Sequence, residues 1–475
     1  MVIDETDIKH CKYLKYYQKN DIFWGCGIEN ETYLFCEDYA TVKGSEIINN
    51  KKRERYSVDY YENFNQESLC EFMYFIVEDR IYNIPLIINS HYLQKCDIFG
   101  NHKTTYTASP QPNPIFSGKT CHELMMENEI LVKMYDENFV FDGDSIEFIT
   151  INFYKNTVKK CIEELVMTKK TVLDNMNIAL NKSLKFQTHN PGFAKYLTNP
   201  NNINICNNGT YHINITLPTK LDKYTNIADY ALFRDNHKKF IRLIQWLEPL
   251  FIACYGSPDI MSTVNTKFAK GSQRCALSRY IGLGTFDSSG MVKGKQLDNF
   301  DPIDNQYTWY NLYHSNSGYN PLKTIGFDIN FNKFKNHGIE IRFFDYFPEC
   351  YLEDVLNIIV LCGELALLQH HIKNPIKKKI WNETIKSCVS SGYQAKLPKK
   401  FVNKISYVFG ISTTIDSPKK LFQLITNDLY QRFYNGWFAE KISPNMQQPV
   451  IKNYNKKMMM LHADFLKCET KNESF

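Results

Sequence analysis

Alternating polar and apolar residues mark several stretches of this chain as strands with one polar and one apolar face. In residues 338–345, Glu340 and Arg342 fall on one face of a strand, whereas Ile339 and Ile341 fall on the other. The apolar side is the one expected to face a core. The polar side would hold a carboxylate and a guanidinium group next to each other on a rigid element.

Three further stretches repeat this design with different polar residues. Their polar faces carry Glu29 and Glu31 in residues 26–34, Glu147 in residues 142–150, and His212, Asn214 and Thr216 in residues 209–218. The alternation is less regular around Glu147 than in the other stretches. Together these stretches predict one sheet with a single polar, functional face.

Helical periodicity predicts long helices over 157–173, 230–255 and 352–368. A strand is expected over 81–88, and Pro85 favours the edge of a sheet for it, because proline cannot donate to a strand ladder. The character of the chain changes near Pro375, where a lysine-rich stretch is typical of a linker. We therefore predict a catalytic domain over residues 1–372 and a helical module over 373–475.

The C-terminal module is basic and rich in aromatic residues, namely Phe422, Tyr430, Phe433, Tyr434, Trp437 and Phe438. Such spacing usually forms a core, so the module is expected to support the catalytic domain. A groove for a peptide or a protein partner is the alternative interpretation.

The residues on the polar faces favour metal and phosphate chemistry. A carboxylate can bind a cation while the neighbouring guanidinium binds phosphate oxygens in a bidentate manner. Two carboxylates about 4 Å apart repel by roughly 4 kcal/mol at an effective dielectric constant near 20, so gathered acids call for a divalent ion. Hard oxygen ligands favour Mg²⁺ or Mn²⁺. Taken alone, Glu340 and Arg342 would favour an ordinary salt bridge on a half-exposed strand, and the other polar strands change that interpretation.

At these residues the chain resembles the carboxylate–amine ligase superfamily, which includes glutamine synthetase, glutamate–cysteine ligase and the amidoligases. The family carries a Glu-x-Glu strand, a later acid, a His-x-His or His-x-Asn strand and a closing Glu-x-Arg strand. The matching elements here are Glu29-Asn30-Glu31, Glu147, His212-Ile213-Asn214 and Glu340-Ile341-Arg342, in the family's order. The resemblance extends from Gly27 to about Asp345.

The resemblance implies a role for each matching residue. Glu29, Glu31, Glu147, His212 and Glu340 would bind two or three divalent ions, Asn214 and Thr216 would contact nucleotide phosphates, and Arg279 and Arg342 would stabilise the transferring phosphoryl group. Arg279 lies where the family places its phosphate-facing arginines, and Arg274 and Lys267 are second choices. A surface loop is an equal alternative for those two.

The resemblance also implies a fold and a reaction. The fold would be α+β, with a curved antiparallel sheet, or open half-barrel, and helices on its outer face, as in glutamine synthetase. The reaction would be ATP-dependent amide-bond formation through an acyl phosphate, with small-molecule or peptide carboxylates and amines as substrates. The chain departs from the glutamine synthetase pattern because Asn214 replaces a second histidine, so the resemblance is closer to the amidoligase branch.

Two other functions compete with this hypothesis. A guanidino-type phosphotransferase would rely more on arginines around the nucleotide than on carboxylates. A non-catalytic scaffold would keep the fold without turnover, but crowded acids would then destabilise it.

Composition narrows the remaining possibilities. The 475 residues are 43% hydrophobic and 14% aromatic, which is typical of a globular chain. The net charge of +5 is too small to predict nucleic-acid binding. Neither an apolar N-terminal signal segment nor an apolar run of membrane-spanning length is evident, so no membrane partner is expected. The 14 cysteines include no Cys-x-x-Cys pair, which favours reduced thiols and a cytoplasmic location.

Overall fold

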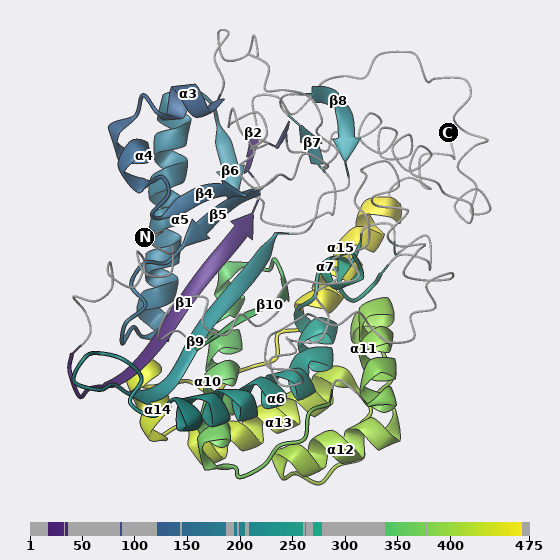
Figure 1. Ribbon diagram of the computed structural model, residues 1–475. Coiled ribbons are helices and arrows are strands. Elements are labelled where there is room, and N and C mark those ends of the chain that lie inside the picture. The colour runs from purple at the N-terminus through teal and green to yellow at the C-terminus, as the bar shows by residue number, and fades with distance from the viewer. Residues whose placement is uncertain are drawn as a thin grey trace.

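The computed structural model describes residues 18–32, 34–36, 86–87, 121–142, 145–186, 194–196, 199–204, 209–259, 262, 269–277, 338–375 and 378–467. Within these ranges the chain is a mixed α+β protein with an open antiparallel sheet and a large helical layer (Figure 1). This much of the predicted fold is confirmed.

The main sheet has five strands in the order β10-β9-β1-β5-β4, and every neighbouring pair is antiparallel. The strands are β1 (Ile22–Thr32), β4 (Phe139–Asp142), β5 (Ser145–Ile149), β9 (Thr210–Lys220) and β10 (Ile339–Asp345). The polar stretches predicted from sequence thus lie on four neighbouring strands of one sheet.

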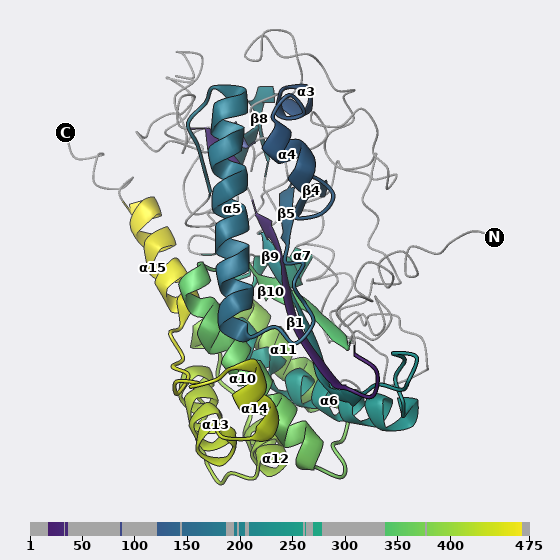
Figure 2. The ribbon, with the colours of Figure 1, turned by 90° about the vertical axis from the view of Figure 1, so that its left-hand side faces the viewer.

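The apolar back of this sheet packs against helices. Back-facing residues such as Ile28, Ile213 and Ile341 are fully or almost fully buried. The covering helices are α5 (Val158–Leu180) and α6 (Tyr230–Tyr255), which contact the strands, and α10 (Leu352–Leu368), which contacts both of these helices. Figure 2 shows α5 and α10 on the same side of the sheet. One face of the sheet is therefore closed by a core.

The three long helices agree with the sequence prediction. Helices α6 and α10 have the expected bounds, whereas α5 continues seven residues beyond the predicted end at Leu173. Thr157 caps α5 by accepting a hydrogen bond from the Lys160 amide, and Asp229 caps α6 in the same way through the Leu232 amide. Both helices thus start at a residue whose side chain satisfies an otherwise open backbone N–H.

A second sheet, which the sequence did not predict, has the order β6-β2-β3-β7-β8. Its strands are β2 (Leu34–Cys36), β3 (Leu86–Ile87), β6 (Leu184–Phe186), β7 (Ala194–Tyr196) and β8 (Asn199–Asn204). Strand β3 pairs with β2 on one side and with β7 on the other. The prediction of an edge strand here was wrong. Pro85 itself lies outside the described residues, and the described strand, Leu86–Ile87, lies between β2 and β7.

The short helices complete the fold. They are α3 (Cys121–Met125), α4 (Glu129–Met134) and α7 (Gln273–Leu277), with single 3-10 turns at η7 (Glu349–Tyr351) and η8 (Gly392–Gln394). Helices α3 and α4 pack against α5, and α7 packs against β10.

The region after residue 372 is helical, as predicted. It contains α11 (Lys379–Ser391), α12 (Lys399–Phe409), α13 (Pro418–Phe433), α14 (Trp437–Ile442) and α15 (Tyr454–Lys467). Phe422 and Phe438 are buried in the same hydrophobic cluster as the sheet and α6, whereas Tyr434 and Trp437 are about half exposed. These helices support the sheet layer through a continuous core, and the boundary at residue 372 stays a prediction. None of the helices in the described ranges is both long and apolar enough to cross a membrane.

Candidate metal centre

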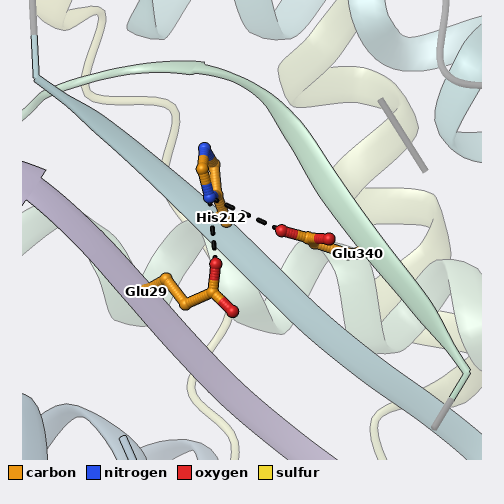
Figure 3. A group of neighbouring side chains, drawn as sticks. All are labelled: Glu29, His212 and Glu340. Carbon is orange, nitrogen blue, oxygen red and sulfur yellow. Dashed lines mark hydrogen bonds and ion pairs between the residues drawn. The ribbon is translucent and has the colours of Figure 1, made fainter. Parts of the chain in front are cut away.

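Three side chains from three adjacent strands meet on the front of the main sheet (Figure 3). Glu29 comes from β1, His212 from β9 and Glu340 from β10. Nδ1 of His212 lies 3.0 Å from Oε2 of Glu29 and 3.5 Å from Oε1 of Glu340. One ligand atom from each residue lies within 4.8 Å of the others, and all three residues are buried. This is the geometry of a site that can hold a metal ion.

Strand register explains why these residues meet. Glu29 is directly opposite His212, and Asn214 is opposite Glu340 on the next strand. Side chains at directly opposite and diagonal positions of antiparallel strands come close enough to interact. The Glu-x-Glu, His-x-Asn and Glu-x-Arg segments therefore meet because their strands are neighbours.

Glu31 and Glu147 extend the acidic group along the sheet. Oε1 of Glu31 lies 3.4 Å from Nε2 of His212. Glu147 on β5 is directly opposite Glu31, and both side chains are half-buried. The predicted metal ligands are thus arranged in a line across four strands, with Glu147 at one end of it.

The imidazole of His212 has different neighbours at its two nitrogens. Nε2 lies 3.3 Å from Nη2 of Arg274, a group that can only donate. The Glu31 carboxylate, which can only accept, lies near the same nitrogen, and Nδ1 lies 3.0 Å from Oε2 of Glu29, so a carboxylate faces each ring nitrogen. A metal ion can bind only a nitrogen that carries no proton, so metal binding at this ring would weaken as the pH falls.

The chemistry of the donor set fits a divalent cation. Two carboxylates within 4.8 Å of each other repel by roughly 3 to 4 kcal/mol at an effective dielectric constant near 20. A divalent ion between them turns that repulsion into attraction. Carboxylate oxygens with a single imidazole suit Mg²⁺ and Mn²⁺, and they also occur around other first-row ions.

A β-bulge next to the cluster positions Arg342. Ile341 pairs with Ile213 and Phe344 pairs with Tyr211, so two residues, Arg342 and Phe343, face the single residue His212. Nη1 of Arg342 donates to Oε1 of Glu340 at 2.7 Å, and the Arg342 side chain is 22% exposed. The alternative salt bridge between these two residues is therefore present, and the Arg342 side chain is partly exposed beside the metal cluster.

The bulge also receives a second arginine. The extra residue turns the carbonyls of Arg342 and Phe343 out of the ladder. They accept hydrogen bonds from Nε of Arg274 at 3.1 Å and from Sγ of Cys275 at 3.5 Å. Burial raises the pKa of the Cys275 thiol well above its usual value, which keeps the donating proton in place.

Asp345 fixes the helix that carries Arg274. Its Oδ1 accepts from the backbone N–H of Arg274 at 3.0 Å, and its Oδ2 accepts from the Ser272 hydroxyl at 2.5 Å. Ser272 in turn caps α7 by accepting from the Cys275 amide at 2.9 Å. Arg274 was only a second choice from sequence, and Asp345 was not considered. The position of Asp345 directly after the Glu-x-Arg strand was the signal that could have suggested it.

Asn214 and Thr216 occupy the polar face of β9, as predicted. Both are buried, and the Thr216 hydroxyl accepts a hydrogen bond from the Gly338 amide at 2.7 Å. That bond places Thr216 in a structural role at the start of β10. Arg279 and Lys267 lie outside the described residues.

An aromatic ring, that of Phe153, covers the front of β1 at Gly25 and Gly27, two to four residues before Glu29. A Cβ atom at Gly25 would lie 1.9 Å from Cε1 of Phe153, and one at Gly27 would lie 2.9 Å from Cδ2 of the same ring. Phe153 packs with Phe23 and Leu221 in a small hydrophobic cluster. The two glycines are thus needed so that the ring can lie against the strand.

Fold and site together define an α+β protein with a candidate metal centre on one face of an antiparallel sheet. Comparison with curated proteins shows 42% identity over 471 residues to "Uncharacterized protein R704" of Acanthamoeba polyphaga mimivirus. The alignment covers 96% of this chain and 83% of the viral protein. The chain belongs to the same family as that viral protein. No family model matches the chain.

Proposed function

We propose that this protein is an ATP-dependent carboxylate–amine ligase of the amidoligase type. The observation that carries the proposal is the buried cluster of Glu29, His212 and Glu340, whose ligand atoms lie within 4.8 Å of one another. Arg342 and Arg274 reach the same cluster from the bulge in β10 and from helix α7.

Strand order gives the proposal a second support. The Glu-x-Glu, His-x-Asn and Glu-x-Arg segments are far apart in sequence but lie on β1, β9 and β10, which are adjacent. The superfamily resemblance requires that adjacency, so the strand order supports the proposal. A glutamine-synthetase-like curvature of this sheet is part of the proposal.

The residues of the centre suit phosphoryl transfer. Divalent ions, when bound, would neutralise the charge of the nucleotide phosphates. Glu29, His212 and Glu340 would hold one ion, and Glu31 and Glu147 would share in holding another. The guanidinium groups of Arg342 and Arg274 would bind phosphate oxygens, and the amide of Asn214 would add a neutral hydrogen bond.

The reaction needs no covalent enzyme nucleophile. A carboxylate oxygen of the substrate attacks the γ-phosphorus of ATP, the bond from that phosphorus to the β–γ bridging oxygen breaks, and ADP leaves. The amine nitrogen then attacks the acyl carbon, inorganic phosphate leaves with the bonding electron pair, and the amine loses a proton to solvent. The protein contributes positioning and electrostatic stabilisation to both steps.

An ADP-release screen tests the proposal. The full chain is incubated with ATP, Mg²⁺ or Mn²⁺, glutamate or peptide carboxylates, and a panel of amines. A ligase releases ADP and phosphate at a rate that rises when both a carboxylate and an amine are present. Transfer of the phosphoryl group to a guanidine would instead identify a guanidino-type phosphotransferase.

A scaffold protein would give a third result. It would release no ADP, and its melting temperature would not change with millimolar metal and ATP. A ligase gains stability from both ligands, by about 2.7 kcal/mol at a hundredfold excess over the dissociation constant. Its need for ATP also agrees with the cytoplasmic location predicted from the cysteines.

A further inference from the structure

A single buried asparagine joins four separate segments next to the loop that leads into α7. Asn455, in the first turn of α15, is fully buried. Its Nδ2 donates to the carbonyl oxygens of Gly256 at 3.1 Å, Lys270 at 2.8 Å and Gly271 at 2.9 Å. Its Oδ1 accepts from the amide of Tyr393 at 2.8 Å. The end of α6, the loop before α7, η8 and α15 therefore meet at one side chain.

The loop before α7 is also held by the end of α11. The Gly271 amide donates to the Val389 carbonyl at 2.8 Å, and the Lys270 amide donates to the Ser390 carbonyl at 3.1 Å. A Cβ atom at Gly271 would lie 1.9 Å from the Cys388 carbonyl oxygen, so only glycine fits. Helices of the C-terminal region thus determine the path of this loop.

Three residues after Gly271 the same backbone carries Arg274. Between the junction and the metal cluster, Asp345 holds both the Ser272 hydroxyl and the Arg274 amide. The guanidinium group then reaches the Arg342 carbonyl and Nε2 of His212. Arg274 is therefore fixed from two sides, by Asp345 at the sheet and by Asn455 at the junction.

We propose that Asn455 is a positioning residue that sets where Arg274 stands at the metal cluster. The inference rests on the proposed function in one respect, which is that Arg274 binds nucleotide phosphates. The C-terminal region then does more than support the sheet. Through Asn455 on α15, it determines the position of Arg274 and hence how strongly Arg274 binds the phosphates.

The test compares two affinities in Asn455→Ala. The metal ligands Glu29, His212 and Glu340 are on the sheet, so the affinity for Mn²⁺, measured by electron paramagnetic resonance, should stay within about threefold of the wild type. Affinity for the Mg²⁺ complex of a non-hydrolysable ATP analogue, measured by calorimetry, should fall about tenfold, or about 1.4 kcal/mol. A general loss of stability would lower the affinities for Mn²⁺ and for the nucleotide together.

Two further variants sharpen the test. Asn455→Asp keeps the shape of the side chain but turns a carboxylate towards three carbonyl oxygens, so it should weaken nucleotide binding at least as much as alanine does. In an Arg274→Ala background, Asn455→Ala should cause no further loss, because both changes act on the same contact. Additive losses in this double-mutant cycle would overturn the proposal.

Asn357→Ala is the matched control. Asn357 is also buried and accepts a hydrogen bond from the Ser443 hydroxyl at 2.7 Å, a contact between α10 and the residue that follows α14. This variant should lower the melting temperature while nucleotide affinity stays at the wild-type value. An equal loss of nucleotide affinity in Asn357→Ala and Asn455→Ala would overturn the proposal.

Hydrogen exchange separates this proposal from the proposed function. If the wild type binds no nucleotide, the proposed function fails, and amide exchange in residues 269–277 decides the positioning role alone. Faster exchange of this segment in Asn455→Ala, but not in Asn357→Ala, supports the role. Unchanged exchange in Asn455→Ala overturns it.

Discussion

The two faces of strand β1 both carry buried polar side chains, but they use them in opposite ways. On the front, Glu29 and Glu340 both lie against His212, and Arg342 forms an ion pair with Glu340. On the back, Asn30 lies between Glu29 and Glu31 in sequence and accepts a hydrogen bond from Nζ of Lys169 at 2.8 Å. Its Nδ2 donates to the carbonyls of Thr210 at 3.0 Å and Glu31 at 3.3 Å.

The back-face group is balanced. Lys169 is buried, forms an ion pair with Glu349 at the start of η7, and lies within 6.0 Å of the ring centres of Phe148, Phe186 and Tyr346. Burial lowers the pKa of Lys169, and the neighbouring Glu349 carboxylate partly offsets that effect. The charge of Lys169 is balanced by that of Glu349, and both the oxygen and the nitrogen of the Asn30 side chain are hydrogen-bonded.

This contrast distinguishes buried polar groups that stabilise the fold from buried polar groups that are expected to bind a ligand. A buried polar group whose charges and hydrogen bonds match is explained by the fold, because it links β1, α5 and η7. The front group holds three carboxylates, Glu29, Glu31 and Glu340, but two guanidinium groups, Arg274 and Arg342, so a further cation would stabilise it. The front face is therefore where a ligand is expected, and four predictions test the distinction.

The largest effect is expected at Glu340. Glu340→Ala removes a metal ligand and the partner of Arg342, so ATP turnover should fall roughly 1000-fold or more, equivalent to about 4 kcal/mol of transition-state stabilisation. The rate of ADP release measures it. Glu353→Ala, an exposed acid in the first turn of α10, should keep full activity. Full activity in Glu340→Ala would remove Glu340 from the metal site.

The next effect concerns stability and belongs to the back face. Lys169→Met leaves Glu349 and Asn30 without their cation, so the free energy of unfolding should fall by about 3 kcal/mol while Mn²⁺ affinity stays unchanged. Chemical denaturation measures the loss. Lys170→Met is the control, since Lys170 is exposed and pairs with Asp174 in the same helix at 2.8 Å. An exposed pair of this kind contributes little to stability, because solvent screens the two charges. Equal losses in both variants would refute the structural role of Lys169.

A pH effect of similar size is expected at His237 on α6. Nε2 of this buried ring accepts from the Leu217 amide at 3.0 Å, and burial lowers its pKa to about 4. The folded state therefore favours the neutral ring, so its stabilising effect is complete above pH 6.5 and is lost as the pH falls towards 4. The loss amounts to about 3 kcal/mol. His237→Gln should flatten this part of the curve of unfolding free energy against pH. An unchanged slope would contradict the assignment.

The smallest effect returns to the front face. Glu29→Gln keeps the shape of the side chain and removes one of the crowded charges. In the presence of a chelator, the free energy of unfolding should therefore rise by about 1 kcal/mol. Glu163→Gln, an exposed position on α5, should stay within about 0.5 kcal/mol of the wild type. A clear loss of stability in Glu29→Gln would mean that this carboxylate is structural, like the Lys169 group.

Periodicity predicted the regular parts of the fold well. Helices α6 and α10 and the polar face of β9 follow from local spacing, although most of each element is buried on all sides. Three of the five predicted metal ligands lie together for the same reason, since alternation fixes which face each one occupies.

The features that sequence did not reveal depend on contacts between distant segments. The bulge at Arg342 and Phe343 forms where the α7 loop docks, and no local pattern encodes that contact. Lys169 looks like a surface residue beside Lys170. However, it follows Leu165 by four residues and precedes Val172 by three, and this helical spacing could have placed it on the buried side.

The ring of Phe153 over Gly25 and Gly27 has a consequence for molecular size. A molecule held at Glu29 and extended along β1 in that direction meets an aromatic stop only two residues away. The ring therefore limits how far a molecule bound at Glu29 can extend in this direction. In the proposed ligase, a long substrate would extend the other way, past Glu31 and Glu147, and a smaller side chain at position 153 would leave more room in the blocked direction.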